Sequence, residues 1–302
     1  MYGMWKRLFI VVTILLVSCS AFGGYFWYQL DVTKNQLADT KIQLDNTLVE
    51  LDNTQTQLDV TKAQLDMTAT QLETEKNKNS QMLSQYIGLK QQIDVRLGST
   101  SEDRQSFITP SDPLVSAKVL KVTGGYSEDV NEYWRDCERL YRWVVSNITY
   151  SSDSYMPILP ETISGGLIWG QECWRMPKET LEDEIGDCED MAVLLTSMLR
   201  SYNEGKYQVW VLVTRSSVSG VGGHAAVGFP VQGGRLAILD PAGNYYTGQY
   251  GSLQSESISI AVSNWLSRWQ REMAGAEIVE VFSESVHEEF SSTAEFVAWA
   301  QE

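Results

Sequence analysis

The stretch GDCEDMAVLLTSMLRS, residues 186–201, carries the pattern that decides the fold of the C-terminal part of this chain. Asp187 is a favoured helix N-cap, and Asp190, three residues on, stands where the partner of a capping box belongs. An apolar stripe at helical spacing follows, formed by Met191, Leu195, Met198 and Leu199. Cys188 falls on the first turn of that predicted helix. A thiol there can be a packed core residue, half of a disulfide, a metal ligand or a nucleophile.

Composition narrows the classes of function. The 302 residues are enough for one or two domains with a real core. A formal net charge of −16 argues against a nucleic-acid partner, because phosphate binding needs a basic face. The four cysteines and two histidines have no zinc-site spacing, and no acidic loop has EF-hand spacing. We therefore expect neither a metal nor a cofactor.

The N-terminus predicts a membrane anchor over residues 1–29. Lys6 and Arg7 precede an uncharged apolar run, residues 8–28, that is long enough to cross a bilayer. The basic pair should stay cytoplasmic, which places the remainder outside the cytoplasm. An alternative is a lipoprotein, because the four residues ending at Cys19 resemble a lipobox whose cleavage would leave a lipidated Cys19. Either reading tethers the protein to a membrane.

A heptad repeat follows the anchor. Leucine recurs at positions 30, 37, 44, 51, 58, 65 and 72, and threonine stands three residues after each leucine from Thr33 to Thr68. Leu at a and Thr at d predict one long helix over residues 30–97 that forms a coiled-coil stalk and a homo-oligomer. Asn79 falls at an a position, which can fix the register. The alternative is a lone polar helix or a disordered spacer.

The sequence after the stalk predicts an α+β domain, which we call the head. Residues 98–126 form a linker and entry segment, and the domain spans residues 127–302. Residues 207–214, 224–229 and 235–240 have strand patterns, and a Gly-rich loop, residues 219–223, precedes a hairpin made by the last two. Further patterns predict helices over 127–146, 258–269 and 293–301, and a strand over 277–282.

Three residues in the head have the types that thiol chemistry requires. The N-terminus of a helix lowers a thiol pKa and offers N–H groups to an oxyanion, whereas the acids beside Cys188 oppose ionisation. His224 is the histidine in the head core, while we expect His287 to be solvated in its acidic segment. Asp240 ends the partner strand of the hairpin, where it can orient His224. Taken singly, each residue is more often structural.

Four motifs together resemble the transglutaminase-like superfamily, in particular its bacterial and archaeal cysteine peptidases. They are WRMPKETL at 174–181, GDCED at 186–190, GHAAV at 223–227 and LDPAG at 239–243. The resemblance implies a papain-like core in which a Cys-bearing helix packs on an antiparallel sheet. By motif position it implies Cys188 as nucleophile, His224 as base and Asp240 as orienting carboxylate, with Trp174 supporting the oxyanion site. Many relatives have a Trp where this chain has Ala226.

The sequence thus predicts a membrane-tethered, extracytoplasmic thiol enzyme. Its Cys-His-Asp triad would hydrolyse peptide or glutamine amide bonds through an acyl-enzyme, and a peptide or protein would be the substrate. The alternatives are a non-catalytic binding scaffold clustered by the coiled coil, and an acyl transferase that cross-links envelope amines. Cys137 and Cys173 either pair as a disulfide, which suits an extracytoplasmic domain, or stay apart, because Cys137 also fits the apolar stripe of its helix.

Overall fold

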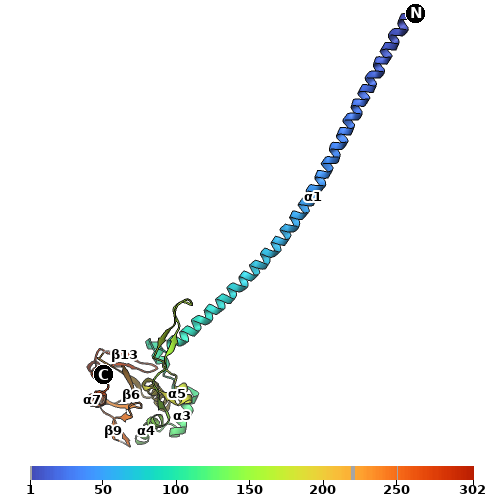
Figure 1. The fold of residues 1–302 in the computed structure, drawn as a ribbon. Helices are drawn as coiled ribbons and strands as arrows, with labels where there is room; N and C mark the ends of the chain where they lie inside the picture. The colour runs from blue at the N-terminus through green and yellow to red at the C-terminus, as the bar shows by residue number, and fades with distance from the viewer. Residues whose placement is uncertain (1, 219–221, 250) are drawn as a thin grey trace. The chain divides into compact units, whose positions relative to one another are not determined.

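The computed structural model describes residues 2–218, 222–249 and 251–302 (Figure 1). The chain divides into two compact units, Met1–Leu83 and Ser84–Glu302. Helix α1, Tyr2–Val95, makes up the whole described part of the first unit and begins the second.

The heptad leucines of α1 face solvent in the isolated chain. The leucines from Leu30 to Leu72 are between 47 and 68% exposed. The threonine hydroxyls of the repeat donate to carbonyls four residues earlier on the same helix, at 2.7–2.9 Å for Thr33, Thr40, Thr47, Thr54, Thr61 and Thr68. Each hydroxyl is thus satisfied within its own helix, which leaves the threonine methyl group available for packing.

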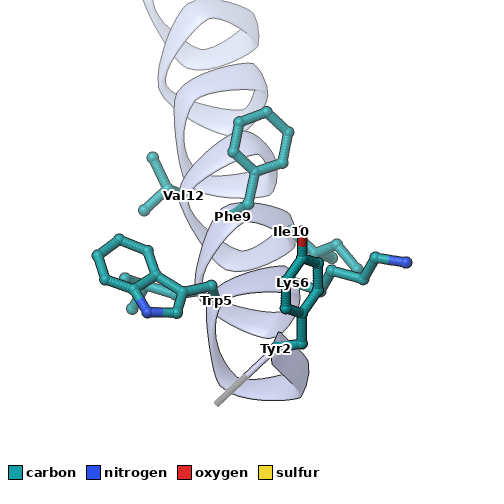
Figure 2. Close-up of a pocket in the computed structure, with 7 residues that line it drawn as sticks. Tyr2, Trp5, Lys6, Phe9, Ile10 and Val12 are labelled. Atoms are coloured by element: carbon teal, nitrogen blue, oxygen red, sulfur yellow. The ribbon is translucent and has the colours of Figure 1, made fainter.

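The first turns of α1 carry exposed apolar side chains. Figure 2 shows Tyr2, Trp5 and Phe9 projecting from the helix, with Lys6 on the side of Tyr2, opposite Trp5. By length and composition α1 is apolar enough near its N-terminus to cross a membrane. That property suits an anchor, and it is shared by signal sequences.

An antiparallel sheet forms the centre of the second unit. Its main path runs β11-β7-β6-β5-β12-β13, and β8 pairs with β7 beside it. The bounds are β5 Trp210–Ser216, β6 Gly223–Val231, β7 Arg235–Asp240, β8 Tyr245–Tyr246, β11 Glu256–Ser257, β12 Ala276–Phe282 and β13 His287–Glu289. The predicted hairpin is confirmed, since β6 and β7 pair with Val227 opposite Leu239.

Helices cover both faces of this sheet. One core packs α3 Pro113–Thr123, α4 Val130–Asn147 and α6 Cys188–Tyr202 on the sheet, and the other packs α7 Ile258–Trp269 and α8 Thr293–Ala300. The period of two along β7 sends Ala237 and Leu239 into the first core and Leu236 and Ile238 into the second. The predicted α+β class is therefore correct.

Segments outside the sheet also pack in the head. The expected linker, residues 98–126, contains α2 Ser101–Ser106 and α3, and Phe107 and Ile108 between them are 0 and 4% exposed. The strand expected from residue 207 begins at Trp210. Of the expected Gly-rich loop, residues 219–221 lie outside the described residues.

Short elements lead into α6. Strand β1, Thr149–Tyr150, pairs in parallel with β4, Ile185–Gly186, which ends one residue before the N-cap of α6. The remaining elements are β2 Met156–Ile158, β3 Ile168–Gly170, α5 Pro177–Asp183, β9 Gly248–Gln249 and β10 Ser252–Leu253.

Candidate active site

The first turn of α6 places Cys188 as its first helical residue, as the capping pattern predicts. Asp187 occupies the N-cap position, and its backbone N–H donates to Asp190 Oδ2 at 3.4 Å. Asp190 Oδ1 accepts from the Arg175 N–H at 2.8 Å, which ties the segment after Trp174 to the helix. Asp187 Oδ1 is buried without a hydrogen-bond partner.

The strand side of the site joins His224 to Asp240. His224 Nε2 lies 2.9 Å from Asp240 Oδ2, and the two side chains are 6 and 0% exposed. The register explains this contact, because Val227 opposite Leu239 puts Asp240 across from Ala226, diagonal to His224 on the same face. A carboxylate can only accept, so in the neutral ring the Nε2 proton is the one donated and Nδ1 keeps its lone pair.

Two tryptophans complete the shell of Asp240. Oδ2 accepts from the indole N–H of Trp265 at 2.9 Å and of Trp269 at 3.0 Å, while Oδ1 accepts from the Gly243 N–H at 2.7 Å. The ring centroids of His224 and Trp269 are 4.0 Å apart. The carboxylate thus receives four donors in a buried position, and the imidazole is fixed by both a hydrogen bond and an aromatic contact.

Gly243 is required by this arrangement. A Cβ on Gly243 would lie 2.5 Å from Asp240 Oδ2 and 2.7 Å from the Trp269 ring. The glycine of the LDPAG motif therefore lets the turn close against the carboxylate.

Sequence reasoning did not predict Trp265 and Trp269. They lie four residues apart in α7, so both fall on one face of that helix. Two indoles at helical spacing were the available signal, since a buried indole N–H needs an acceptor.

The thiol side has a different set of contacts. Cys188 Sγ donates to Glu189 Oε2 at 3.1 Å. Among the residues that the structure describes, no hydrogen bond links this thiol to the His224 ring. The thiol lies beside the backbone of Ala225, whose N–H acts to lower the Cys188 pKa. Burial, with the charges of Glu189 and Asp187, outweighs that effect and raises the Cys188 pKa well above its ordinary value.

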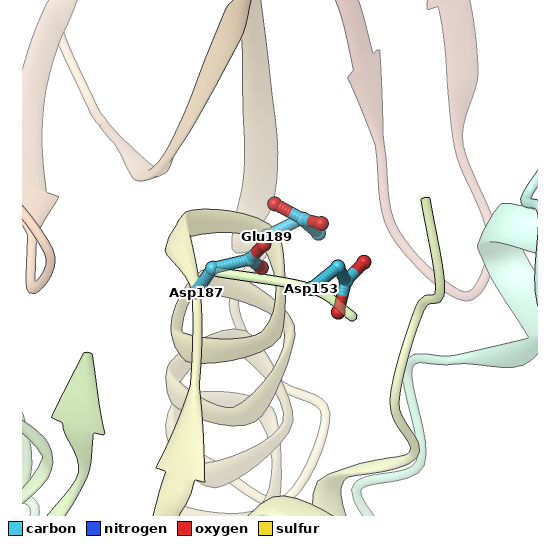
Figure 3. A group of neighbouring side chains, drawn as sticks. All are labelled: Asp153, Asp187 and Glu189. Atoms are coloured by element: carbon cyan, nitrogen blue, oxygen red, sulfur yellow. The ribbon is translucent and has the colours of Figure 1, made fainter. Parts of the chain in front are cut away.

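Three carboxylates lie together at the N-terminus of α6 (Figure 3). One ligand oxygen from each of Asp153, Asp187 and Glu189 lies within 4.8 Å of the others. Burial, then the Asp187 charge, raises the pKa of Asp153 to about 6 and that of Glu189 to about 10. Oxygen ligands at this spacing could hold a hard divalent cation, which would relieve their repulsion.

Two further residues singled out in the sequence, Trp174 and His287, have their own contacts. The Trp174 ring is 6% exposed and packs between Phe107 and Phe282, each at a centroid distance of 5.7 Å. His287, expected to be solvated, instead lies 2.9 Å from the buried Glu280, so that expectation is wrong. The two strands β12 and β13 pair Phe282 with His287 and bring the ring over Glu280.

The four cysteines are free thiols in the structure. Cys137 is 2% exposed in the core of α4, where burial raises its pKa. Cys137 and Cys173 are therefore not joined by a disulfide in the structure.

Comparison with known proteins finds one similar family. Residues 126–261 match a family described as a transglutaminase-like domain. No curated protein sequence matches the chain. The match ends before Trp265 and Trp269.

Among solved structures, LapG from Legionella pneumophila is 16% identical, with a TM-score of 0.33, over 62% of this chain and 97% of its own. A protein from Cytophaga hutchinsonii, provisionally called a cysteine protease, is also 16% identical, with a TM-score of 0.30. That similarity covers 61% of this chain and 53% of the Cytophaga protein. At these TM-scores neither similarity bears on the function.

Proposed function

We propose that the chain is a thiol enzyme that hydrolyses peptide or glutamine amide bonds with Cys188, His224 and Asp240. The buried, four-donor shell of Asp240 is the observation that supports it most. A carboxylate placed this way fixes the tautomer and orientation of His224, and Nδ1 is left to accept a proton. The transglutaminase-like domain at residues 126–261 agrees with this chemistry.

The proposed reaction has the following steps. His224 Nδ1 takes the thiol proton as Cys188 Sγ attacks the substrate carbonyl carbon, and the helix N-terminus with the Cys188 N–H stabilises the oxyanion. The carbon–nitrogen bond then breaks and the imidazolium proton goes to the leaving amine. Water attacks the thioester with His224 again as base, which releases the acid and restores the thiol.

The resting contact of Cys188 with Glu189 adds one step. The thiol is protonated at neutral pH because its pKa is raised, so a stored thiolate is not the starting state. Attack therefore begins when the thiol exchanges its hydrogen bond to Glu189 for one to the His224 imidazole. The imidazole then removes the thiol proton as a general base.

The test of the proposed chemistry uses the full-length chain in detergent with a library of peptides that contain Gln and Lys. Mass spectrometry separates peptide cleavage, side-chain deamidation and cross-linking to an amine. We expect cleavage or deamidation that Cys188→Ala abolishes. Products that persist in Cys188→Ala, or no product from any peptide, would reject the proposed activity.

We further propose that the N-terminal helix anchors the chain in a membrane with the domain outside the cytoplasm. The exposed leucine stripe of α1 supports a coiled-coil homo-oligomer, since each leucine needs a partner surface. Replacing Leu51 and Leu58 with Asn should convert a cross-linkable oligomer to monomer in detergent. An unchanged oligomer would contradict the coiled coil.

A further inference from the structure

We infer that the β2–β3 hairpin is a docking arm for an extended apolar segment of a polypeptide substrate, an inference that rests on the proposed function. The arm is residues 153–173, olive-green in Figure 1, where it stands out from the rest of the head. A docking arm of this kind implies that the substrate is a polypeptide and not a small amide.

Apolar side chains are concentrated on this arm and face solvent. Five of them are between 56 and 66% exposed, namely Tyr155, Ile163, Leu167, Ile168 and Trp169. Ile168 and Trp169 are adjacent on β3 and thus point to opposite faces, so the ribbon is open on both faces there. Exposed apolar surface that is concentrated on one element is a mark of interaction sites.

Both ends of the arm are held, which makes it a fixed surface. At its tip, Tyr86 Oη donates to the Pro160 carbonyl at 2.5 Å and Lys90 Nζ lies 3.1 Å from Glu161 Oε1. At its base, the Cys173 N–H donates to the Asp153 carboxylate. A surface held this way costs little conformational entropy when a ligand docks.

The strands of the arm have unused edges. In the described part of the chain, β2 and β3 pair only with each other, with Pro157 opposite Trp169. An extended peptide can add to such an edge through backbone hydrogen bonds while its apolar side chains pack on the faces. That combination favours an extended apolar chain over a folded partner.

The base of the arm lies next to the carboxylates that neighbour the thiol. This position indicates that the ligand of the arm is a substrate of the thiol. Asp153 belongs to the carboxylate cluster beside Cys188, with Asp187 and Glu189 within 4.8 Å. The five residue-to-residue steps from Asp153 to Ile158 span roughly 17 Å when extended. A substrate chain that lies on β2 and β3 therefore reaches Cys188 about five residues away from its apolar segment.

The experiment measures peptide binding to the full-length chain with Cys188→Ala in lipid nanodiscs. The probe is a fluorescent peptide whose first half is Val and Ile and whose second half is Gly, Gln and Lys. A matched peptide has Ser at each apolar position. The paired variant Ile168→Ser with Trp169→Ser is compared with Ile260→Ser, which removes an isoleucine 54% exposed on α7.

We expect the apolar peptide to bind and the Ser peptide to bind at least about tenfold more weakly. The arm variant should lose about tenfold or more of the affinity for the apolar peptide, and Ile260→Ser should lose none. Equal binding in all variants, or binding of neither peptide, would contradict the role of the arm as a docking surface. So would a change of oligomer size in the arm variant without peptide, which would assign the surface to a second copy.

Failure of the arm and failure of the chemistry give different results. In the Cys188-intact chain, a small alkylating reagent reports the thiol without using the arm, and its rate should be the same in the arm variant. Retained peptide binding with no cleavage would reject the chemistry and keep the docking surface. Cleavage that is insensitive to the arm variant would do the reverse.

Discussion

The candidate site has a strand side, around Asp240, and a helix side, at the N-terminus of α6. The carboxylates on these two sides differ in how many hydrogen-bond donors they receive. On the strand side, the Asp240 carboxylate receives donors from His224, Trp265, Trp269 and Gly243. On the helix side, carboxylates face one another, and Asp187 Oδ1 has no partner. Asp240, Asp187 and Glu189 are all buried, so the difference lies in the supply of donors.

This difference separates two tasks. A saturated carboxylate costs little to keep buried and holds an imidazole in one orientation, which suits a base. A cluster of carboxylates that lacks hydrogen-bond donors destabilises the folded state. A proton, a cation or a positively charged substrate would relieve this repulsion. In the proposed function the base is therefore built in advance, whereas the reactivity of Cys188 would depend on the charge that reaches its acidic neighbours.

The largest effect should come from the imidazole. His224→Asn removes the proton acceptor and should lower the hydrolysis rate by about a thousandfold or more. His287→Asn is the matched control, because His287 lies on β13 against Glu280 and has no place in the reaction. Steady-state cleavage of the best library peptide checks both variants. Equal losses in the two variants would show that the effect of His224→Asn is general destabilisation.

The tryptophan donors should give the next largest effect. Trp265→Phe and Trp269→Phe each remove one hydrogen bond to Asp240 and should lower kcat by roughly tenfold to a hundredfold with KM little changed. Trp210→Phe is the control, because the Trp210 indole N–H is buried without a partner and its loss should cost nothing. A purely structural role would lower the melting temperature while kcat per folded molecule stayed the same.

The buried carboxyls of Glu189 and Asp190 should make the head less stable as pH rises. Burial raises the pKa of Asp190 to about 8 and of Glu189 to about 10. Unfolded carboxyls ionise near pH 4, so the stability that these groups contribute is complete below that pH and is lost as pH rises through 8 and 10. Urea unfolding with a chelator present should show several kcal/mol less stability at pH 9 than at pH 5, because each group contributes a loss of about 1.4 kcal/mol per pH unit between its unfolded and its folded pKa. A rise in stability over that range would contradict the assigned burial.

The smallest effect concerns a cation. Millimolar calcium should raise the melting temperature by a few degrees at pH 8, because oxygen ligands from Asp153, Asp187 and Glu189 could share the ion. Asp187→Asn should remove most of that increase. An equal increase in Asp187→Asn would place the calcium effect elsewhere.

Local patterns in the sequence predict much of this site. The capping pattern around Asp187 predicts where α6 begins, and the β6–β7 hairpin predicts that Asp240 reaches His224. Tertiary contacts determine the rest. Nothing near Asp240 in sequence indicates that two indoles from α7 would bond to it, and nothing near residue 153 indicates that Asp153 would meet Asp187.

His287 shows the same limit of sequence reasoning. Its acidic segment indicated solvation, but pairing of β12 with β13 puts its ring against a glutamate that is 3% exposed. Local composition does not report which neighbour a strand register supplies.

The most direct test of the central claim is the rate at which iodoacetamide alkylates Cys188 near neutral pH, read by peptide mass in the non-reduced full-length chain. Cys173 in the same sample is the internal reference. The account predicts that the Cys188 rate in the unmodified chain exceeds that in His224→Asn by about tenfold or more, while the Cys173 rate is the same in both. Equal Cys188 rates with and without His224 would contradict a thiol activated by this imidazole.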